Sequence, residues 1–231
     1  MTVPGNITVV AVHGAWADGS SWKDVIFSLE REGLRVLAAP IPLTSLGDDT
    51  AALKRAIART EGPVILVGHA YAGAVIATGN DERVKALVYI AALAPDEGET
   101  VAEVFYRDER HDQAPQLAPD GDGFIWMPAE GFRNAFAQHA TADQIALSAA
   151  VQRPIALKCI QEPVPKPAWR SKPSWFLIAE EDRMINPKTQ HFMANRMRAT
   201  TRSLVVDHTP LLSAPQKVVD IILEAKQAVS S

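Results

Sequence analysis

The stretch Val64-Ile65-Leu66-Val67-Gly68-His69-Ala70-Tyr71-Ala72-Gly73 decides the fold of this chain. Its first four aliphatic residues predict a buried strand, and the small apolar run from Tyr71 to Thr78 predicts a helix packed tightly against a sheet. A sharp turn from a strand into a helix is the layout of a nucleophile elbow, whose middle residue points above the sheet. Ala70 stands at that middle position, where serine is expected.

Five further segments have the character of strands. They are rich in β-branched or aromatic residues and alternate with helix-length stretches: Ile7–Val12, Arg35–Ala38, Val84–Ala91, Trp175–Ala179 and Ser203–Val206. Several are apolar on both alternating faces, as strands covered by helices on two sides are, and alternation with helices indicates a parallel sheet. We therefore predict an α/β fold with a doubly wound, mostly parallel sheet of about six strands.

Helices are expected between these strands. Ser20–Arg31 carries an amphipathic stripe that Ser20 or Ser21 can cap. Asp48 or Asp49 can cap a helix that runs through Ala58. The pattern Ser213-Ala214-Pro215-Gln216 predicts a capping box at the start of a last helix, which reaches to about Val229.

The segment 96–172 breaks the alternation. It contains no clear strand, many prolines and several aromatic residues, and its portion Phe132–Ala150 looks helical. We expect one domain over residues 1–231, in which this segment is a lid inserted over the carboxyl ends of the strands. Trp126 in the lid and Trp16 after the first strand are expected as walls of a substrate pocket, with plain core packing as the alternative.

Composition excludes several classes of protein. The net charge is −4 and basic residues are scattered among acidic ones, so nucleic acid is not an expected partner. The run Val84–Ala94 is far shorter than the roughly 20 apolar residues that span a membrane. The single cysteine and an N-terminus without a signal-peptide pattern favour a cytoplasmic protein. No His, Cys, Asp and Glu set has metal spacing, so neither a metal nor another cofactor is expected.

Three more segments fit the elbow. His13-Gly14-Ala15-Trp16 follows the first strand, Asp182 follows the strand that ends at Ala179, and His208 follows the last strand. The order of nucleophile position, acid and histidine is that of α/β-hydrolases. Alternatives stay open, because Asp182 could be a plain turn residue, His208 a loop hydrogen-bonding residue, and Asp96 a different acid.

Longer stretches carry a family resemblance. The chain resembles small bacterial α/β-hydrolases, which are relatives of plant methyl-ester esterases and hydroxynitrile lyases, over nearly its whole length. The stretches that carry this resemblance are Val12–Trp22, Tyr89–Gly98 and Glu181–Ile185.

The resemblance implies the α/β-hydrolase fold with a helical lid. It also implies Asp182 and His208 as the acid and base of a triad, and the backbone N–H groups of Ala15 and Tyr71 as an oxyanion hole. Ala70 departs from the family pattern at the nucleophile, and Ala72 departs at the following glycine. Two changes at one turn favour natural divergence over a laboratory substitution.

Ala70 removes the acyl-enzyme route, because loss of a triad serine costs on the order of 10⁶ in turnover. A histidine base contributes about 10²–10⁴ without a covalent step. The sequence thus predicts a cofactor-free enzyme that uses His208 and Asp182 on a small, largely apolar carbonyl or hydroxyl compound. Two alternatives remain: a serine-type carboxylesterase in ancestry that persists in nucleophile-less form, and a ligand-binding module. The expected partner is a small-molecule substrate, and a homodimer is left open.

Overall fold

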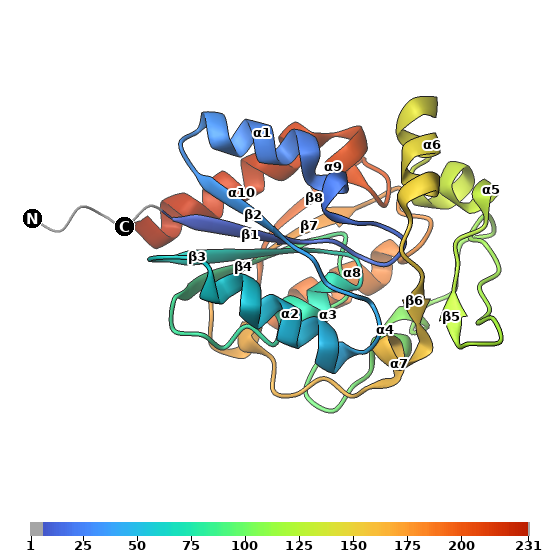
Figure 1. Ribbon diagram of the computed structural model, residues 1–231, viewed down its shortest axis with the longest axis horizontal. Coiled ribbons are helices and arrows are strands. Elements are labelled where there is room, and N and C mark those ends of the chain that lie inside the picture. Colours follow the sequence, from blue (N-terminus) through green and yellow to red (C-terminus); the bar gives the residue numbers. More distant parts are fainter. Residues whose placement is uncertain (1–6, 231) are drawn as a thin grey trace, which may run out of the picture.

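A six-stranded parallel sheet forms the centre of the computed structural model, which describes residues 7–230 (Figure 1). The N-terminal stretch that favours a cytoplasmic protein lies outside the described residues. Every neighbouring pair of strands is parallel, which confirms the predicted doubly wound α/β architecture. In spatial order the strands are β2 (Arg35–Ala39), β1 (Thr8–Val12), β3 (Val64–His69), β4 (Val84–Ile90), β7 (Ser174–Ala179) and β8 (Thr200–Leu204).

Helices cover both faces of the sheet, because alternate strand residues point to opposite sides. Val9 and Ala11 of β1 pack in one apolar cluster, beneath α1 (Lys23–Arg31), α9 (Pro210–Ser213) and α10 (Pro215–Ser230). Val10 and Val12 pack in the other cluster, against α2 (Leu46–Ala58), α3 (Ala72–Ile76) and α8 (Pro187–Met197). Figure 1 shows these two groups of helices above and below the sheet.

Three predicted helix starts are corrected by the structure. The side chain of Ser45, not of Asp48 or Asp49, caps α2 by accepting a hydrogen bond from the Asp48 N–H at 2.9 Å. The Ser213 hydroxyl donates to Asp207 at 2.6 Å, so α10 simply begins at Pro215. The stretch before α1 is a short 3₁₀ turn, η1 (Gly19–Trp22), and it is capped not by Ser20 or Ser21 but by Asp18, whose carboxylate accepts a hydrogen bond from the Ser20 N–H at 2.8 Å.

The last strand was expected at Ser203–Val206 and lies instead at Thr200–Leu204. β8 is an edge strand, and its residues Thr200-Thr201-Arg202-Ser203 are partly or fully exposed. A strand that buries little has no apolar alternation to mark its start, which explains the shift of three residues.

Most of the insertion 96–172 lies at the carboxyl ends of the strands, on the right in Figure 1, and its last residues run back along the lower side to the start of β4, where the Lys172 amine donates to the Val84 carbonyl at 2.9 Å. Contrary to the expectation of no strand, it contains a small antiparallel pair, β5 and β6. The predicted helical portion is split between a π-helical turn and α6. The elements of the insertion are α4 (Val101–Phe105), β5 (Phe124–Ile125), α5 (Ala129–Gly131), η2 (Phe132–Phe136), α6 (Ala142–Val151), β6 (Ile155–Ala156), α7 (Leu157–Gln161) and η3 (Ala168–Arg170).

The topology fixes where a site can form. From β1 the chain crosses to the edge strand β2 and then returns to β3 on the other side of β1. The loops after β1 and β3 therefore diverge, and ligands bind at such switch points outside the carboxyl ends of the strands. Both the His13-Gly14 loop and the turn at Ala70 lie there. None of the helices within residues 7–230 is long and apolar enough to cross a membrane.

Candidate active site

The turn at Ala70 has the backbone geometry of an elbow. Its φ of 51° lies in the left-handed region, which costs a residue with a Cβ about 1–2 kcal/mol. The surroundings hold this conformation, since the Ala70 carbonyl accepts hydrogen bonds from the N–H groups of Leu93 at 2.9 Å and Gly73 at 3.1 Å. The turn thus keeps a strained conformation although Ala70 carries no reactive group.

Small residues around the turn have a steric cause. A Cβ on Gly73 would lie 2.2 Å from the Leu93 carbonyl oxygen, and one on Gly68 would lie 2.8 Å from the Ala72 carbonyl oxygen. Ala72 itself is fully buried. α3 therefore lies so close to β3 and to the segment after β4 that only small residues fit at this turn, and alanine fits at position 72.

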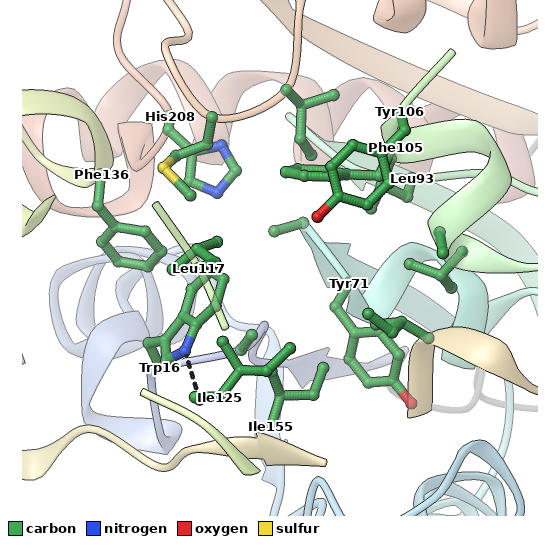
Figure 2. A pocket seen from close by; sticks show the side chains of 17 residues that line it. Trp16, Tyr71, Leu93, Phe105, Tyr106, Leu117, Ile125, Phe136, Ile155 and His208 are labelled. Atoms are coloured by element: carbon green, nitrogen blue, oxygen red, sulfur yellow. Dashed lines mark hydrogen bonds between the residues drawn. The ribbon is translucent and has the colours of Figure 1, made fainter. Parts of the chain in front are cut away.

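His208 and Asp182 are in direct contact at the carboxyl ends of the last two strands. The Nδ1 of His208 donates to Oδ2 of Asp182 at 2.8 Å, and both side chains are almost completely buried. This contact leaves Nε2 of His208 without a partner among residues 7–230, and the ring faces the cavity in Figure 2. The imidazole is thereby held with its acceptor nitrogen towards the cavity.

The Asp182 carboxylate is held from several directions. Its Oδ1 accepts hydrogen bonds from the N–H groups of Met184 at 2.7 Å and Ile185 at 2.8 Å. Its Oδ2 also accepts from the side-chain amide of Gln190 at 2.8 Å. Hydrogen bonds from fixed donors stabilise the charged carboxylate in a buried place. Asp182 is therefore a buried hydrogen-bond acceptor for four donors and not a plain turn residue.

Two further buried histidines lie behind this pair. Nε2 of His69 donates to the His208 carbonyl oxygen at 2.7 Å, with ring centroids 4.9 Å apart. Burial, and next the neighbouring His208, lower the pKa of His69 to about 3, so its ring is neutral. Burial also lowers the pKa of His13, whose Nδ1 lies 3.0 Å from the Gly14 carbonyl. His69 and His13 thus act as neutral packing groups that brace the loops around His208.

The backbone N–H groups of Ala15 and Tyr71 have no hydrogen-bond partner in the part of the chain that the structure describes. Both residues line the same cavity as Ala70 and His208. The neighbouring Trp16 has a φ of 57°, and its own N–H donates to the Arg153 carbonyl at 3.0 Å. The loop after β1 is therefore anchored to the insertion while its Ala15 amide stays free.

The cavity above Ala70 has apolar walls (Figure 2). It holds about 600 Å³ of space, part of it open to solvent. Walls of hydrophobic and aromatic side chains with few polar groups are typical of sites that bind small organic molecules. Much of the wall comes from the insertion, through Val101, Phe105, Leu117, Ile125, Phe136 and Ile155.

The two tryptophans expected at the cavity differ in the structure. Trp16 lines it, and its indole N–H donates to the Ile125 carbonyl at 2.9 Å. Trp126 does not line it: its side chain is 51% exposed and donates to Asp120 at 3.1 Å. In a short strand such as β5, neighbouring side chains point to opposite sides, and Ile125 takes the inward position.

The alternative acid, Asp96, is used elsewhere. Its carboxylate pairs with the Arg170 guanidinium at 2.7 Å near the surface and has no bond to His208. Within residues 7–230 no cluster of His, Cys, Asp and Glu is arranged to hold a metal ion. The structure therefore supplies one histidine and acid pair at the cavity.

Two supporting residues had no signal in the sequence. Gln190 on α8 is fully buried and joins Asp182 to the Ile185 carbonyl, at 3.0 Å from the latter. Asp49 on α2 accepts the Tyr71 phenol at 2.7 Å, and burial raises the pKa of Asp49 to about 6 despite this hydrogen bond. Both act through tertiary contacts that no local pattern reveals.

The elbow, the order of its partners and the parallel sheet define an enzyme class, and comparison with known proteins agrees. Residues 9–221 match the alpha/beta hydrolase family, and the chain belongs to that family.

Individual relatives are distant. The chain is 22% identical to norfluorocurarine synthase 2 of Strychnos, over 95% of each chain. Its backbone resembles polyneuridine aldehyde esterase with a TM-score of 0.84, at 17% identity over 96% of this chain and 99% of that one. It equally resembles a variant of tomato methylketone synthase I complexed with β-ketoheptanoate, with a TM-score of 0.84 at 16% identity over 97% and 99%. At such identities the likeness establishes the shared fold.

Proposed function

We propose that this protein is a cofactor-independent enzyme in which His208, oriented by Asp182, acts as a general base. Its substrate is a small, largely apolar carbonyl or hydroxyl compound that binds above Ala70. The observation that carries the proposal is an intact, buried contact of 2.8 Å between His208 and Asp182 beside a position that has no nucleophile. A base kept without a nucleophile suits proton transfer and not acyl transfer.

The chemistry needs only groups that the chain supplies. Nε2 of His208 takes a proton from a substrate O–H or C–H group, and Asp182 stabilises the resulting imidazolium. The free N–H groups of Ala15 and Tyr71 then donate to the oxygen on which negative charge develops. Each such donor contributes roughly 10²–10³ in rate when it is held in place in a site from which water is excluded.

The insertion completes the site as a lid. Its apolar residues form much of the cavity wall, including Phe105 and Phe136. An apolar, water-poor cavity strengthens the interaction of a developing anion with fixed N–H donors. It also selects against highly charged substrates, because burying an unpaired charge is costly.

Two probes test the proposal, namely mandelonitrile and β-ketoheptanoate. Cleavage of mandelonitrile begins with loss of its O–H proton and releases cyanide and an aldehyde. Loss of CO₂ from β-ketoheptanoate leaves an enolate, which the two N–H groups would hold until its carbon takes up a proton. The methylketone synthase variant similar in fold to this chain binds the second compound.

The experiment compares kcat/KM for wild type, His208→Ala and His191→Ala. His191 is a matched control, because it also donates to a carboxylate at 2.8 Å but is exposed. We expect turnover of at least one probe, a loss of about 10²–10⁴ in His208→Ala, and no change in His191→Ala. Equal activity of wild type and His208→Ala would overturn the proposal. Binding of both probes without turnover would indicate a ligand-binding protein instead.

A further inference from the structure

The cavity wall contains few free hydrogen-bonding groups. The indole N–H of Trp16 is occupied by the Ile125 carbonyl, and the Tyr71 phenol is occupied by Asp49. Among the polar side chains that line the cavity, this leaves His208 and Tyr106. His208 is assigned to proton transfer, so Tyr106 is the one whose role is open.

Tyr106 stands at the mouth of the cavity, directly after α4. Its side chain is 53% exposed, and its ring packs edge-on against Phe105 with centroids 4.9 Å apart. In Figure 2 the Tyr106 hydroxyl points into the cavity. It has no hydrogen-bond partner within residues 7–230. The ring is thus held by packing while the hydroxyl remains available.

A ligand that fills the cavity contacts this hydroxyl. An apolar ligand would cover this hydroxyl without offering it an acceptor, which is unfavourable. A ligand with an oxygen acceptor near the mouth would form a hydrogen bond instead. The neighbouring residues Val101 and Phe105, which line the cavity from α4, are apolar and cannot donate this hydrogen bond.

We infer that Tyr106 is a specificity-determining residue that donates a hydrogen bond to a second oxygen of the substrate, so that the preferred substrates are small dicarbonyl compounds. The first oxygen is the reacting one, which the amides of Ala15 and Tyr71 hold, and this part of the inference rests on the proposed function. The second oxygen, a keto or carboxylate oxygen, lies nearer the mouth. The carbon frame between and beside them contacts the apolar wall.

The test measures binding, so it does not depend on turnover. Dissociation constants for acetylacetone and for methyl propyl ketone are determined by NMR titration, since the two ligands differ in one carbonyl oxygen. The variant is Tyr106→Phe, which removes the hydroxyl and keeps the ring. Tyr89→Phe is the matched control, because Tyr89 is fully buried on β4, stacks on Phe176 and has an unpartnered hydroxyl remote from the cavity wall.

We expect wild type to bind acetylacetone more tightly than the monoketone. Tyr106→Phe should weaken acetylacetone binding about 3–10-fold, as loss of one hydrogen bond does, and leave the monoketone unchanged. Tyr89→Phe should change neither constant. Wild type that does not discriminate between the ligands, or binds neither, would overturn the inference. An equal loss for both ligands in Tyr106→Phe would also overturn it, since it would indicate lost packing.

The two proposals fail separately. If His208→Ala retains turnover while Tyr106→Phe loses discrimination, the proposed base is wrong and the recognition of a second oxygen holds. If His208→Ala loses turnover and Tyr106→Phe discriminates as wild type does, the base stands and the substrate class does not.

Discussion

Two histidine and carboxylate pairs of this protein have the same contact distance and opposite surroundings. His208 contacts Asp182 at 2.8 Å with side chains 2% and 0% exposed, whereas His191 contacts Glu180 at 2.8 Å with side chains 46% and 34% exposed. Water screens the exposed pair, so its interaction is weak. The buried pair is held by protein donors alone.

The difference shows why sequence and distance do not identify a catalytic pair by themselves. Asp182 has three donors besides His208, and His208 has a nitrogen free towards the cavity. Glu180 accepts from His191 and from the Ser203 hydroxyl at the surface. Of these two pairs, only the buried one combines a fixed orientation with a place at the cavity wall, and the following experiments separate the two pairs.

The largest effect is expected from Ala70→Ser, which places a hydroxyl beside the buried pair. Serine tolerates the φ of 51° that alanine already adopts. Hydrolysis of p-nitrophenyl acetate should rise about 10³-fold or more, given the roughly 10⁶ that a triad serine contributes to turnover. A fluorophosphonate probe should label the variant and not the wild type.

Second substitutions tie this gain to one pair. Ala70→Ser combined with His208→Ala should lose the gain, while Ala70→Ser combined with His191→Ala should keep it. Absence of any gain in Ala70→Ser would show that the turn no longer belongs to a working hydrolase frame. It would argue against serine-type ancestry as the explanation of the retained pair.

Substitution of each carboxylate by alanine should lower the free energy of unfolding by different amounts in the two pairs. Asp182→Ala leaves His208 and three other donors without their acceptor, so the free energy of unfolding should fall by about 3–5 kcal/mol. Glu180→Ala should stay within about 1 kcal/mol of wild type. Urea denaturation measures both. Similar losses in the two variants would contradict the contrast drawn between buried and exposed pairs.

Asp49 extends the comparison to a buried carboxylate that has no histidine. Burial raises its pKa from 3.8 to about 6, so the folded state holds the proton more tightly than the unfolded state. Its contribution to stability is present below pH 4 and is lost as the pH rises through about 6. The asparagine side chain in Asp49→Asn cannot ionise, so this variant does not lose stability in this way as the pH rises.

The measurement is the difference in unfolding free energy between Asp49→Asn and wild type at several pH values. This difference should shift in favour of the variant by about 2 kcal/mol between pH 4 and pH 7. Asp112→Asn, at an exposed and solvated position, should show no comparable shift. A difference for Asp49→Asn that is independent of pH would be incompatible with a raised pKa.

The smallest effect is expected from Trp126→Ala. Its indole is hydrogen-bonded, as that of Trp16 is, but it lies outside the cavity and is half exposed. Stability should change by no more than about 0.5 kcal/mol, and the affinity for acetylacetone should not change. A loss of ligand affinity in this variant would instead indicate that Trp126 contacts the ligand in the cavity.

The fold was largely predictable because buried parallel strands leave a strong local signal. Val64–Val67 is aliphatic throughout, and the structure has β3 there. The edge strand β8 was misplaced because its exposed residues have no such pattern. The pair β5 and β6 was missed because two-residue strands are too short to show any period.

The candidate site divides in the same way. Ala70, Asp182 and His208 follow strands at positions that a known chain order predicts, and the structure places them at one edge of the sheet. Three further residues lie in helices or at helix ends: Tyr106, Gln190 and Asp49. Their roles depend on tertiary contacts, which the local sequence does not reveal. The prediction placed Trp126 at the cavity wall, but its neighbour Ile125 lies there instead. Successive residues of a strand point to opposite faces, so an error of one residue exchanges the inward and outward side chains.

The central claim is that His208 takes a proton in this cavity without a nucleophile at Ala70. Its most direct test is the rate at which methyl propyl ketone exchanges the hydrogens next to its carbonyl for deuterium in D₂O, followed by NMR. Wild type should exchange at least about 10²-fold faster than His208→Ala, and His191→Ala should match wild type. Equal exchange rates in wild type and His208→Ala would contradict the claim.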